Sequence, residues 1–168
     1  ALARVLHVLE RIGGRTVYLA LLNENAVARE RLLELCAHSQ FLADQIAAFP
    51  LLLDELLDER LFTAVPARQE LAQELRARMA DCGGDDAEEQ VDALRQFQRA
   101  AMFRIAVPDL TGRLPLMKVS DRLTDLAELL VGEALESGLD AALVHTPSET
   151  HPEIVATLLR AGVPVLVD

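Results

Sequence analysis

The hydrophobic pattern of the sequence changes near Gly138, and this change limits the folds that the chain can adopt. Before Gly138, apolar residues recur three and four positions apart, which is typical of amphipathic helices that bury one face. After it, two short apolar runs of strand length flank one more helical stretch. We therefore expect a mainly α fold, a multi-helix bundle with a C-terminal βαβ appendage, divided into domains at residues 1–137 and 138–168.

The composition also favours helices. Apolar residues make up 51% of the 168-residue chain, yet aromatic residues make up only 4% and tryptophan is absent. Leu, Ala and Val must therefore form the core, and Leu and Ala are strong helix formers. We expect the apolar stripes of the helices to be core rather than grooves for partners.

Capping residues and helix breakers predict where the helices begin and end. Asn25, Ser39 and Ser120 can each accept a hydrogen bond from the first backbone N–H groups of a helix. Pro50 is tolerated in the first turn of a helix, whereas Pro108 is expected to end the long helix that precedes it. Glycines are expected to close other helices, and they are Gly13, Gly14, Gly83, Gly84 and Gly138, whereas Gly112 is expected to mark a loop.

The net charge limits the classes of partner that the chain can bind, and the two cysteines indicate the cell compartment. The formal net charge is −11, and an acidic surface repels phosphate backbones, so we expect no nucleic-acid partner. Cys36 and Cys82 lack metal-site spacing and are expected to be reduced thiols in a cytoplasmic protein. No apolar run approaches about 20 residues and no export signal opens the chain, so we expect neither a membrane span nor secretion.

No pattern in the sequence predicts a metal site or a catalytic residue. None of the four histidines has a second histidine four positions away, and no cysteine lies near one in a zinc pattern; they are His7, His38, His145 and His151. Acidic pairs such as Asp54 and Glu55 are typical of solvated helix faces. We therefore assign no catalytic residue, no metal ligand and no cofactor of this chain's own.

Six ordered blocks resemble the bacterial glutamine synthetase adenylyltransferase family over residues 1–135. They are residues 18–25 (YLALLNEN), 32–39 (LLELCAHS), 49–58 (FPLLLDELLD), 92–97 (DALRQF), 104–106 (RIA) and 114–121 (LPLMKVSD). The resemblance implies the helical segment ahead of the second, adenylylating catalytic domain. It also implies a parent enzyme that adenylylates and deadenylylates glutamine synthetase in nitrogen control, uses Mg²⁺ and ATP, and responds to a PII signalling protein.

The same resemblance implies that this chain alone is inactive. In the family, catalysis depends on a Gly-Ser turn followed by Asp-x-Asp, because two carboxylates on one strand must reach the Mg²⁺ bound to ATP. Residues 137–142 (SGLDAA) are similar to this motif, but Ala142 occupies the position of the second carboxylate. The expected function is therefore a non-catalytic helical module that positions or regulates nucleotidyltransferase domains.

The tail resembles a different family. Residues 143–151 (LVHTPSETH) and 161–168 (AGVPVLVD) are similar to the dinucleotide-binding domain of the Gfo/Idh/MocA oxidoreductases. The resemblance implies that Thr146 and Pro147 match positions against the NAD(P) cofactor. The family's glycine-rich phosphate turn is missing from this sequence, and the chain ends at Asp168, before the family's catalytic lysine. The alternative function is thus a fragment of an NAD(P)-dependent oxidoreductase.

A third alternative is a protein-interaction domain. An isolated βαβ unit exposes two strand edges and an apolar sheet face, which must be covered by the helices or by a partner. Self-association through the C-terminal strands is therefore a further expectation.

Overall fold

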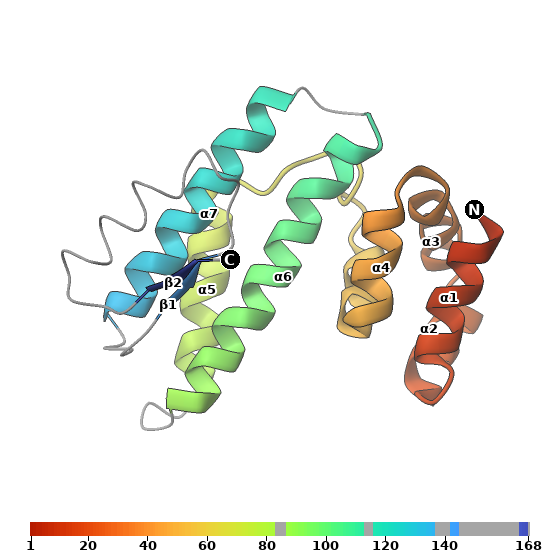
Figure 1. Ribbon diagram of the computed structural model, residues 1–168, viewed down its shortest axis with the longest axis horizontal. Coiled ribbons are helices and arrows are strands. Elements are labelled where there is room, and N and C mark those ends of the chain that lie inside the picture. The colour runs from red at the N-terminus through yellow and green to blue at the C-terminus, as the bar shows by residue number, and fades with distance from the viewer. Residues whose placement is uncertain (83–86, 113–115, 137–141, 145–164, 168) are drawn as a thin grey trace. The chain divides into compact units, whose positions relative to one another are not determined.

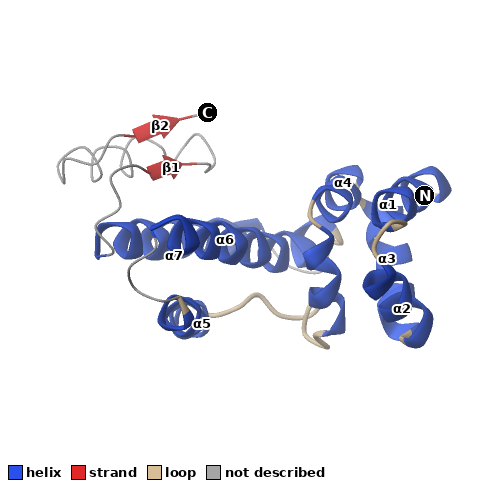
Figure 2. Cartoon of the chain, turned by 90° about the horizontal axis from the view of Figure 1, so that it is seen from below, coloured by secondary structure: helices blue, strands red, loops and turns tan. Residues whose placement is uncertain are grey.

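The structure is a computed structural model of the 168-residue chain. It describes residues 1–82, 87–112, 116–136, 142–144 and 165–167 (Figure 1). Helices make up almost all of this described part, and only two short strands are present (Figure 2). The expectation of a mainly α fold is therefore confirmed.

The elements follow one another with short connections. In chain order they are α1 (Leu2–Ile12), α2 (Thr16–Glu24), α3 (Ala26–His38), α4 (Gln40–Ala48), the 3-10 helix η1 (Pro50–Leu57), α5 (Arg68–Asp81), α6 (Ala87–Leu110), α7 (Leu116–Glu136), β1 (Ala142–Val144) and β2 (Val165–Val167).

The chain forms two compact units, and the sequence passes between them three times. Unit 1 consists of Ala1–Val65 and Phe103–Val119. Unit 2 consists of Pro66–Met102 and Ser120–Asp168. Helices α6 and α7 therefore each contribute residues to both units.

Unit 1 is built around α3, which packs against α1, α2, α4 and η1, while α1 also packs against α4. Its core comes from residues spaced three and four apart, so that each helix buries one stripe. The fully buried members are Val8, Ile12, Ala28, Leu35, Cys36, Leu42, Ala43, Ile46, Leu53, Leu56, Ile105 and Val107. Burial of each large aliphatic side chain stabilises the fold by about 1.5–3 kcal/mol.

Unit 2 buries a second apolar set on α5, α6 and α7, namely Leu71, Leu75, Leu94, Phe97, Ala100, Ala101, Leu126, Ala127 and Ala134. The guanidinium of Arg78 on α5 lies 6.0 Å from the centroid of the buried Phe97 ring on α6. A cation over an aromatic face is attracted by the ring quadrupole. This contact therefore adds an electrostatic component to apolar packing between the two helices.

Two of the predicted helix starts are confirmed. The Asn25 side chain accepts a hydrogen bond from the Ala28 N–H at 3.0 Å, and the Ser39 hydroxyl accepts one from the Leu42 N–H at 3.3 Å. Pro50 is the first residue of η1, where its missing N–H costs nothing. These three residues mark the boundaries between α2, α3, α4 and η1, which follow one another without a long loop.

The helix ends in unit 1 use a different device, since arginines from other elements donate to their last carbonyls. Arg29 Nη1 donates to Leu22 O and Asn23 O at the end of α2, at 2.7 and 2.8 Å. Arg4 Nη1 donates to the α3 carbonyls of Cys36 and Ala37, at 2.9 and 3.2 Å.

Arg31 serves the end of η1 in the same way. Its Nη1 donates to the carbonyl oxygens of Leu56 and Asp58, the latter at 2.8 Å. The last carbonyls of a helix have no partner within that helix, so each of these arginines supplies a missing donor. Because donor and acceptor lie on different elements, the same bonds also fix one element against another.

Two predicted boundaries are wrong. Helix α6 continues through Pro108 to Leu110. Pro108 has no N–H to donate to the carbonyl four residues earlier, but the helix ends within its next turn, where Thr111 bonds back to Val107 O through both N–H (3.0 Å) and hydroxyl (2.7 Å). Gly112, which was expected only to mark a loop, has φ +71°, the left-handed conformation typical just after the end of a helix.

Ser120 is not a helix cap, because α7 begins one turn earlier, at Leu116. Ser120 lies inside the helix, where its backbone oxygen accepts a hydrogen bond from the Thr124 hydroxyl at 3.2 Å. A proline directly precedes Leu116 in the sequence, and proline is favoured in the first helical turn. That signal, rather than the serine, marks the start of α7.

The two strands pair in parallel, with Ala142 opposite Val165, Leu143 opposite Leu166 and Val144 opposite Val167. Parallel pairing is what a βαβ connection requires. The helix expected between the strands falls on residues 145–164, and the domain boundary falls within residues 137–141, all outside the described residues. The complete βαβ unit therefore stays a prediction.

Replacing Leu35 by Ala should lower the free energy of unfolding by about 2–5 kcal/mol, because it leaves a cavity in the core of unit 1. Leu33→Ala on the same helix is the control, since Leu33 is 53% exposed and should cost less than about 1 kcal/mol. Urea unfolding followed by circular dichroism measures both. Equal losses would contradict the packing of α3.

Replacing Arg31 by Met should lower the free energy of unfolding by about 1–2 kcal/mol, because two carbonyls at the end of η1 lose a charged donor. Arg31→Lys should restore part of this loss, since an ammonium can still donate. Arg11→Met is the matched control, because Arg11 is exposed and makes no hydrogen bond within the described residues. A similar loss in the Arg11 variant would argue against the capping role.

Candidate functional site

Unit 1 carries a shallow, open hollow between α2 and η1, which we call the α2–η1 hollow. It has a volume of about 530 Å³ and is lined by Val17, Ala20, Leu21, Glu24, Asn25 and Leu57. The four α2 residues Val17, Ala20, Leu21 and Glu24 follow helical spacing and so share one face of α2. This face was expected to be core, but Val17 is 75% exposed and Leu57 47% exposed.

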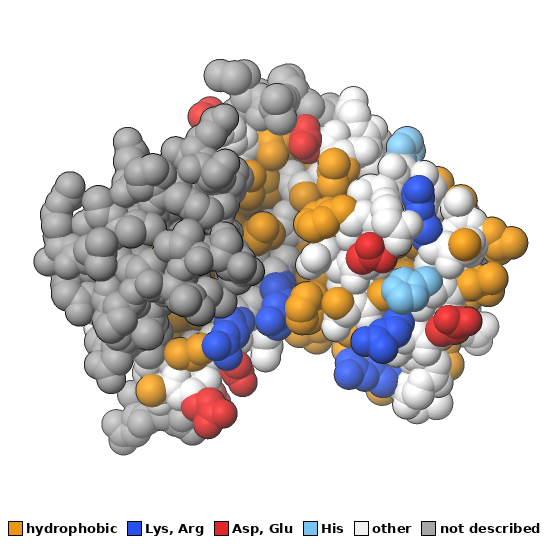
Figure 3. All heavy atoms as spheres, viewed as in Figure 1, with side chains coloured by type: hydrophobic (Ala, Val, Ile, Leu, Met, Phe, Trp, Pro, Cys, Tyr) orange, Lys and Arg blue, Asp and Glu red, His pale blue; other side chains and the backbone are white. Residues whose placement is uncertain are grey.

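Exposed apolar side chains gather on unit 1 as a whole. Figure 3 shows them on the surface of the α1–α4 region. Every exposed large apolar residue found in the described part of the chain belongs to this unit: Leu2, Leu6, Val17, Leu19, Val27, Leu33, Phe41, Leu51, Leu57 and Leu110. Contiguous exposed apolar surface marks sites of interaction in folded proteins.

Most of the net charge, in contrast to the exposed apolar side chains, lies on unit 2. Unit 1 holds nine Arg and Lys side chains and ten Asp and Glu side chains, whereas unit 2 holds seven and seventeen. Almost all of the net charge of −11 therefore belongs to unit 2. Unit 1 is nearly neutral and apolar on its surface, and unit 2 is acidic.

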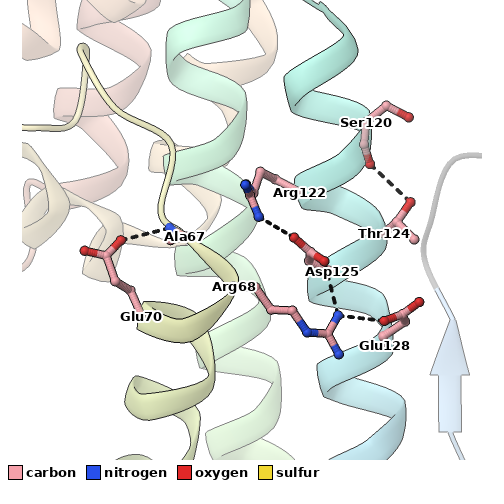
Figure 4. A network of polar contacts seen from close by, with 8 residues as sticks. All are labelled: Ala67, Arg68, Glu70, Ser120, Arg122, Thr124, Asp125 and Glu128. Atoms are coloured by element: carbon pink, nitrogen blue, oxygen red, sulfur yellow. Dashed lines mark hydrogen bonds and ion pairs between the residues drawn. The ribbon is translucent and has the colours of Figure 1, made fainter.

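An ionic network joins α5 to α7 in unit 2 (Figure 4). Arg68 Nη1 lies 3.1 Å from Asp125 Oδ1 and 2.6 Å from Glu128 Oε2, and Arg122 also pairs with Asp125. The two carboxylates, Glu128 first, raise the pKa of Arg68 above its ordinary value. All four side chains are at least partly exposed, so the network contributes about 1 kcal/mol or less and serves to orient the helices.

A less exposed ion pair joins η1 to α6 within unit 1. Arg104 Nε lies 3.4 Å from Glu55 Oε2, and the two side chains are only 15% and 19% exposed. Glu55 and Arg104 come from two of the six sequence blocks that carry the family resemblance, residues 49–58 and 104–106. The pair therefore ties together two segments that are distant in the sequence.

Neither cysteine has the environment of a reactive thiolate. Cys36 is buried, and burial raises the pKa of its thiol. Cys82 is half-buried and donates to Arg78 O at 3.3 Å, and its pKa is raised by desolvation and by the nearby carboxylates of Glu89 and Asp81. A thiolate is the nucleophilic form of cysteine, so a raised pKa lowers reactivity.

The candidate cofactor residues Thr146 and Pro147, like His145 and His151, lie outside the described residues. His7 is an exposed residue whose Nε2 lies 3.9 Å from Asp44 Oδ1, and His38 is exposed at the end of α3. Within the described ranges, no three His, Cys, Asp or Glu side chains are arranged to hold a metal ion. No helix there has both the length and the apolar character needed to cross a bilayer.

The α2–η1 hollow was missed by sequence reasoning. Its signal was the spacing of Val17, Ala20, Leu21 and Glu24, which is the same for a helix face that packs inward and for one that stays exposed. Tertiary packing distinguishes the two, because α2 packs on α3 and α1 and buries Leu22, whereas the face with Val17 stays exposed.

Replacing Arg104 by Met should lower the free energy of unfolding by about 1–3 kcal/mol, because Glu55 loses its cation in a site with little solvent. The double variant Arg104→Met/Glu55→Leu should recover at least half of that loss. Arg95→Met is the matched control, since Arg95 pairs with Asp92 on the exposed surface of the same helix and should cost under about 0.5 kcal/mol. Chemical denaturation measures all three, and an unchanged Arg104 variant would contradict the role of the pair.

Comparison with known proteins gives the family. The family model for glutamate-ammonia ligase adenylyltransferase matches residues 29–158, a range that includes Thr146 and Pro147. A "bifunctional glutamine synthetase adenylyltransferase/adenylyl-removing enzyme" of Pseudomonas putida is 50% identical over 134 residues, and those of Pseudomonas aeruginosa and Pasteurella multocida are 51% and 46% identical over 135 residues.

Each of these alignments covers 80% of this chain but only 14% of the relative, so the chain spans about one seventh of the length of these enzymes. The family model, in contrast, matches well over half of the chain. The chain therefore belongs to the glutamate-ammonia ligase adenylyltransferase family.

Proposed function

We propose that this chain is a non-catalytic helical module of a glutamine synthetase adenylyltransferase. It positions or regulates the nucleotidyltransferase domains that adenylylate and deadenylylate glutamine synthetase in nitrogen control. The observation that carries the proposal is the family match over residues 29–158, which covers most of the helical part of the chain. Ala142, where the resemblance calls for the second carboxylate, supports the non-catalytic assignment.

The helices suit a positioning role. Helices α6 and α7, of 24 and 21 residues, extend over about 36 and 32 Å at 1.5 Å per residue. The Arg104–Glu55 pair fixes α6 to η1, and the Arg68 network fixes α5 to α7. Contacts of this kind hold the helices within each unit in place, which supports a positioning role.

The cofactors and partners of the parent enzyme belong to the same proposal. Mg²⁺ and ATP would serve the catalytic domains, and the described residues of this chain supply no ligand set for the metal. Glutamine synthetase is the substrate that the relatives' names state. A PII signalling protein as regulator and a cytoplasmic location complete the proposal.

The tail supports a second candidate function only through the parallel pairing of β1 and β2. In this alternative, residues 138–168 form a βαβ domain, and Thr146 and Pro147 lie against NAD(P). Millimolar NADH should then raise the melting temperature, because a ligand present at 100 times its dissociation constant stabilises the folded state by about 2.7 kcal/mol. Melting curves at rising protein concentration test self-association through the strands in the same experiment.

The proposed function predicts that the 168-residue chain transfers no AMP to glutamine synthetase, because the metal clamp of two carboxylates is incomplete. The measurement is incorporation of label from radioactive ATP with Mg²⁺, with a full-length relative such as the Pseudomonas aeruginosa enzyme as positive control. A full-length enzyme from which the matching 135-residue segment is deleted should lose regulated transfer. Label transferred by the isolated chain, or normal regulation without the segment, would refute the proposal.

A further inference from the structure

The α2–η1 hollow has apolar chemistry over most of its surface and one charge at one end. Val17, Ala20, Leu21 and Leu57 supply the apolar part. Glu24 and Asn25 lie together at the C-terminal end of α2. Asn25 uses its side-chain oxygen to accept from the Ala28 N–H, so the carboxylate of Glu24 is the charged group of the hollow that a ligand can reach.

Glu24 is paired with no cation among the residues that the structure describes. Its side chain is exposed and makes no hydrogen bond or ion pair within the described residues. The arginine at this end of α2, Arg29, donates to the carbonyls of Leu22 and Asn23 rather than to this carboxylate. The hollow therefore offers an apolar surface with a free negative charge at its edge.

This combination suits a helix better than a small molecule. Small-molecule sites are concave and use several convergent polar groups to fix orientation. The α2–η1 hollow is open and has one free carboxylate. A groove that binds an amphipathic helix instead takes apolar anchors spaced three or four residues apart, and charges at the rim set the orientation.

The length of the relatives indicates where such a helix comes from. The chain spans about one seventh of the enzymes that it matches, so in them most of the polypeptide lies outside this segment. Unit 1 is nearly neutral and holds all the exposed large apolar side chains of the described residues. A surface of this kind inside a long polypeptide is expected to be covered by another part of that polypeptide.

We propose that the α2–η1 hollow docks an amphipathic helix from the remainder of the adenylyltransferase polypeptide. Two apolar side chains of that helix, one turn apart, fill the hollow beside Leu57, and a lysine or arginine pairs with Glu24. The inference deepens the proposed function and rests on it, because it takes the parent enzyme as the source of the helix.

The test uses the whole 168-residue chain and overlapping synthetic peptides of about 25 residues that tile the rest of the Pseudomonas aeruginosa relative. Fluorescence anisotropy measures the affinity of each peptide. At least one basic amphipathic peptide should bind the unaltered chain. Leu57→Glu should weaken that binding at least about 10-fold, because it removes a central apolar contact and places a carboxylate against the apolar side chains of the peptide.

Two further variants separate the hollow from general surface effects. Glu24→Gln should weaken binding about 3- to 5-fold and reduce its dependence on salt, as expected for a pair at the rim. Leu33→Glu, at a residue of similar exposure on α3 that does not line the hollow, should leave binding unchanged. Circular dichroism melting of all three variants checks that each is folded.

Several outcomes would overturn the docking proposal: no peptide binds, Leu33→Glu weakens binding as much as Leu57→Glu, or the chain forms a dimer that Leu57→Glu dissociates. The last outcome would assign the hollow to a second copy of the chain. The binding measurement involves no catalysis, so failure here leaves the AMP-transfer result intact. AMP transfer by the isolated chain would instead refute the non-catalytic assignment and leave the peptide-binding result as measured.

Discussion

Unit 1 depends on hydrogen-bond donors for the carbonyl groups at the ends of its helices. The last turn of a helix leaves these carbonyls without donors from the helix itself. Arg4, Arg29 and Arg31 supply donors from other elements, and these bonds join α1 to α3, α3 to α2 and α3 to η1. Helix α3 supplies two of the three arginines and also contributes the buried Leu35 and Cys36. Apolar packing brings the elements of unit 1 together, and the directional arginine bonds then fix their register.

Local features of the fold could be read from the sequence, since they depend on neighbouring residues. Asn25, Ser39 and Pro50 have the roles predicted for them. Pro108 and Ser120 do not, because a proline or a serine has the expected effect only at a particular distance from a helix end. The arginine caps could not be predicted, since Arg4 and Arg31 reach carbonyls at least 25 residues away along the chain.

The candidate site likewise combines features set by neighbouring residues with features set by residues far apart in the sequence. A stripe of Val17, Ala20 and Leu21 on α2 predicts that one face is apolar, but whether it is covered depends on which neighbour takes the other face. Thr146 and Pro147, the residues that a family resemblance indicated, lie outside the described part of the chain. The division between an apolar unit 1 and an acidic unit 2 also depends on tertiary structure, because each unit is assembled from two separated stretches of sequence.

Both units share helix α6, since residues 87–102 belong to unit 2 and residues 103–110 to unit 1. In an α-helix each N–H bonds to the carbonyl four residues earlier, so the N–H groups just after Met102 bond to carbonyls just before Phe103. If either unit melts, the other loses hydrogen-bond partners inside its own helix. Each unit therefore relies on the other for the backbone hydrogen bonds of the α6 turn that spans Met102 and Phe103.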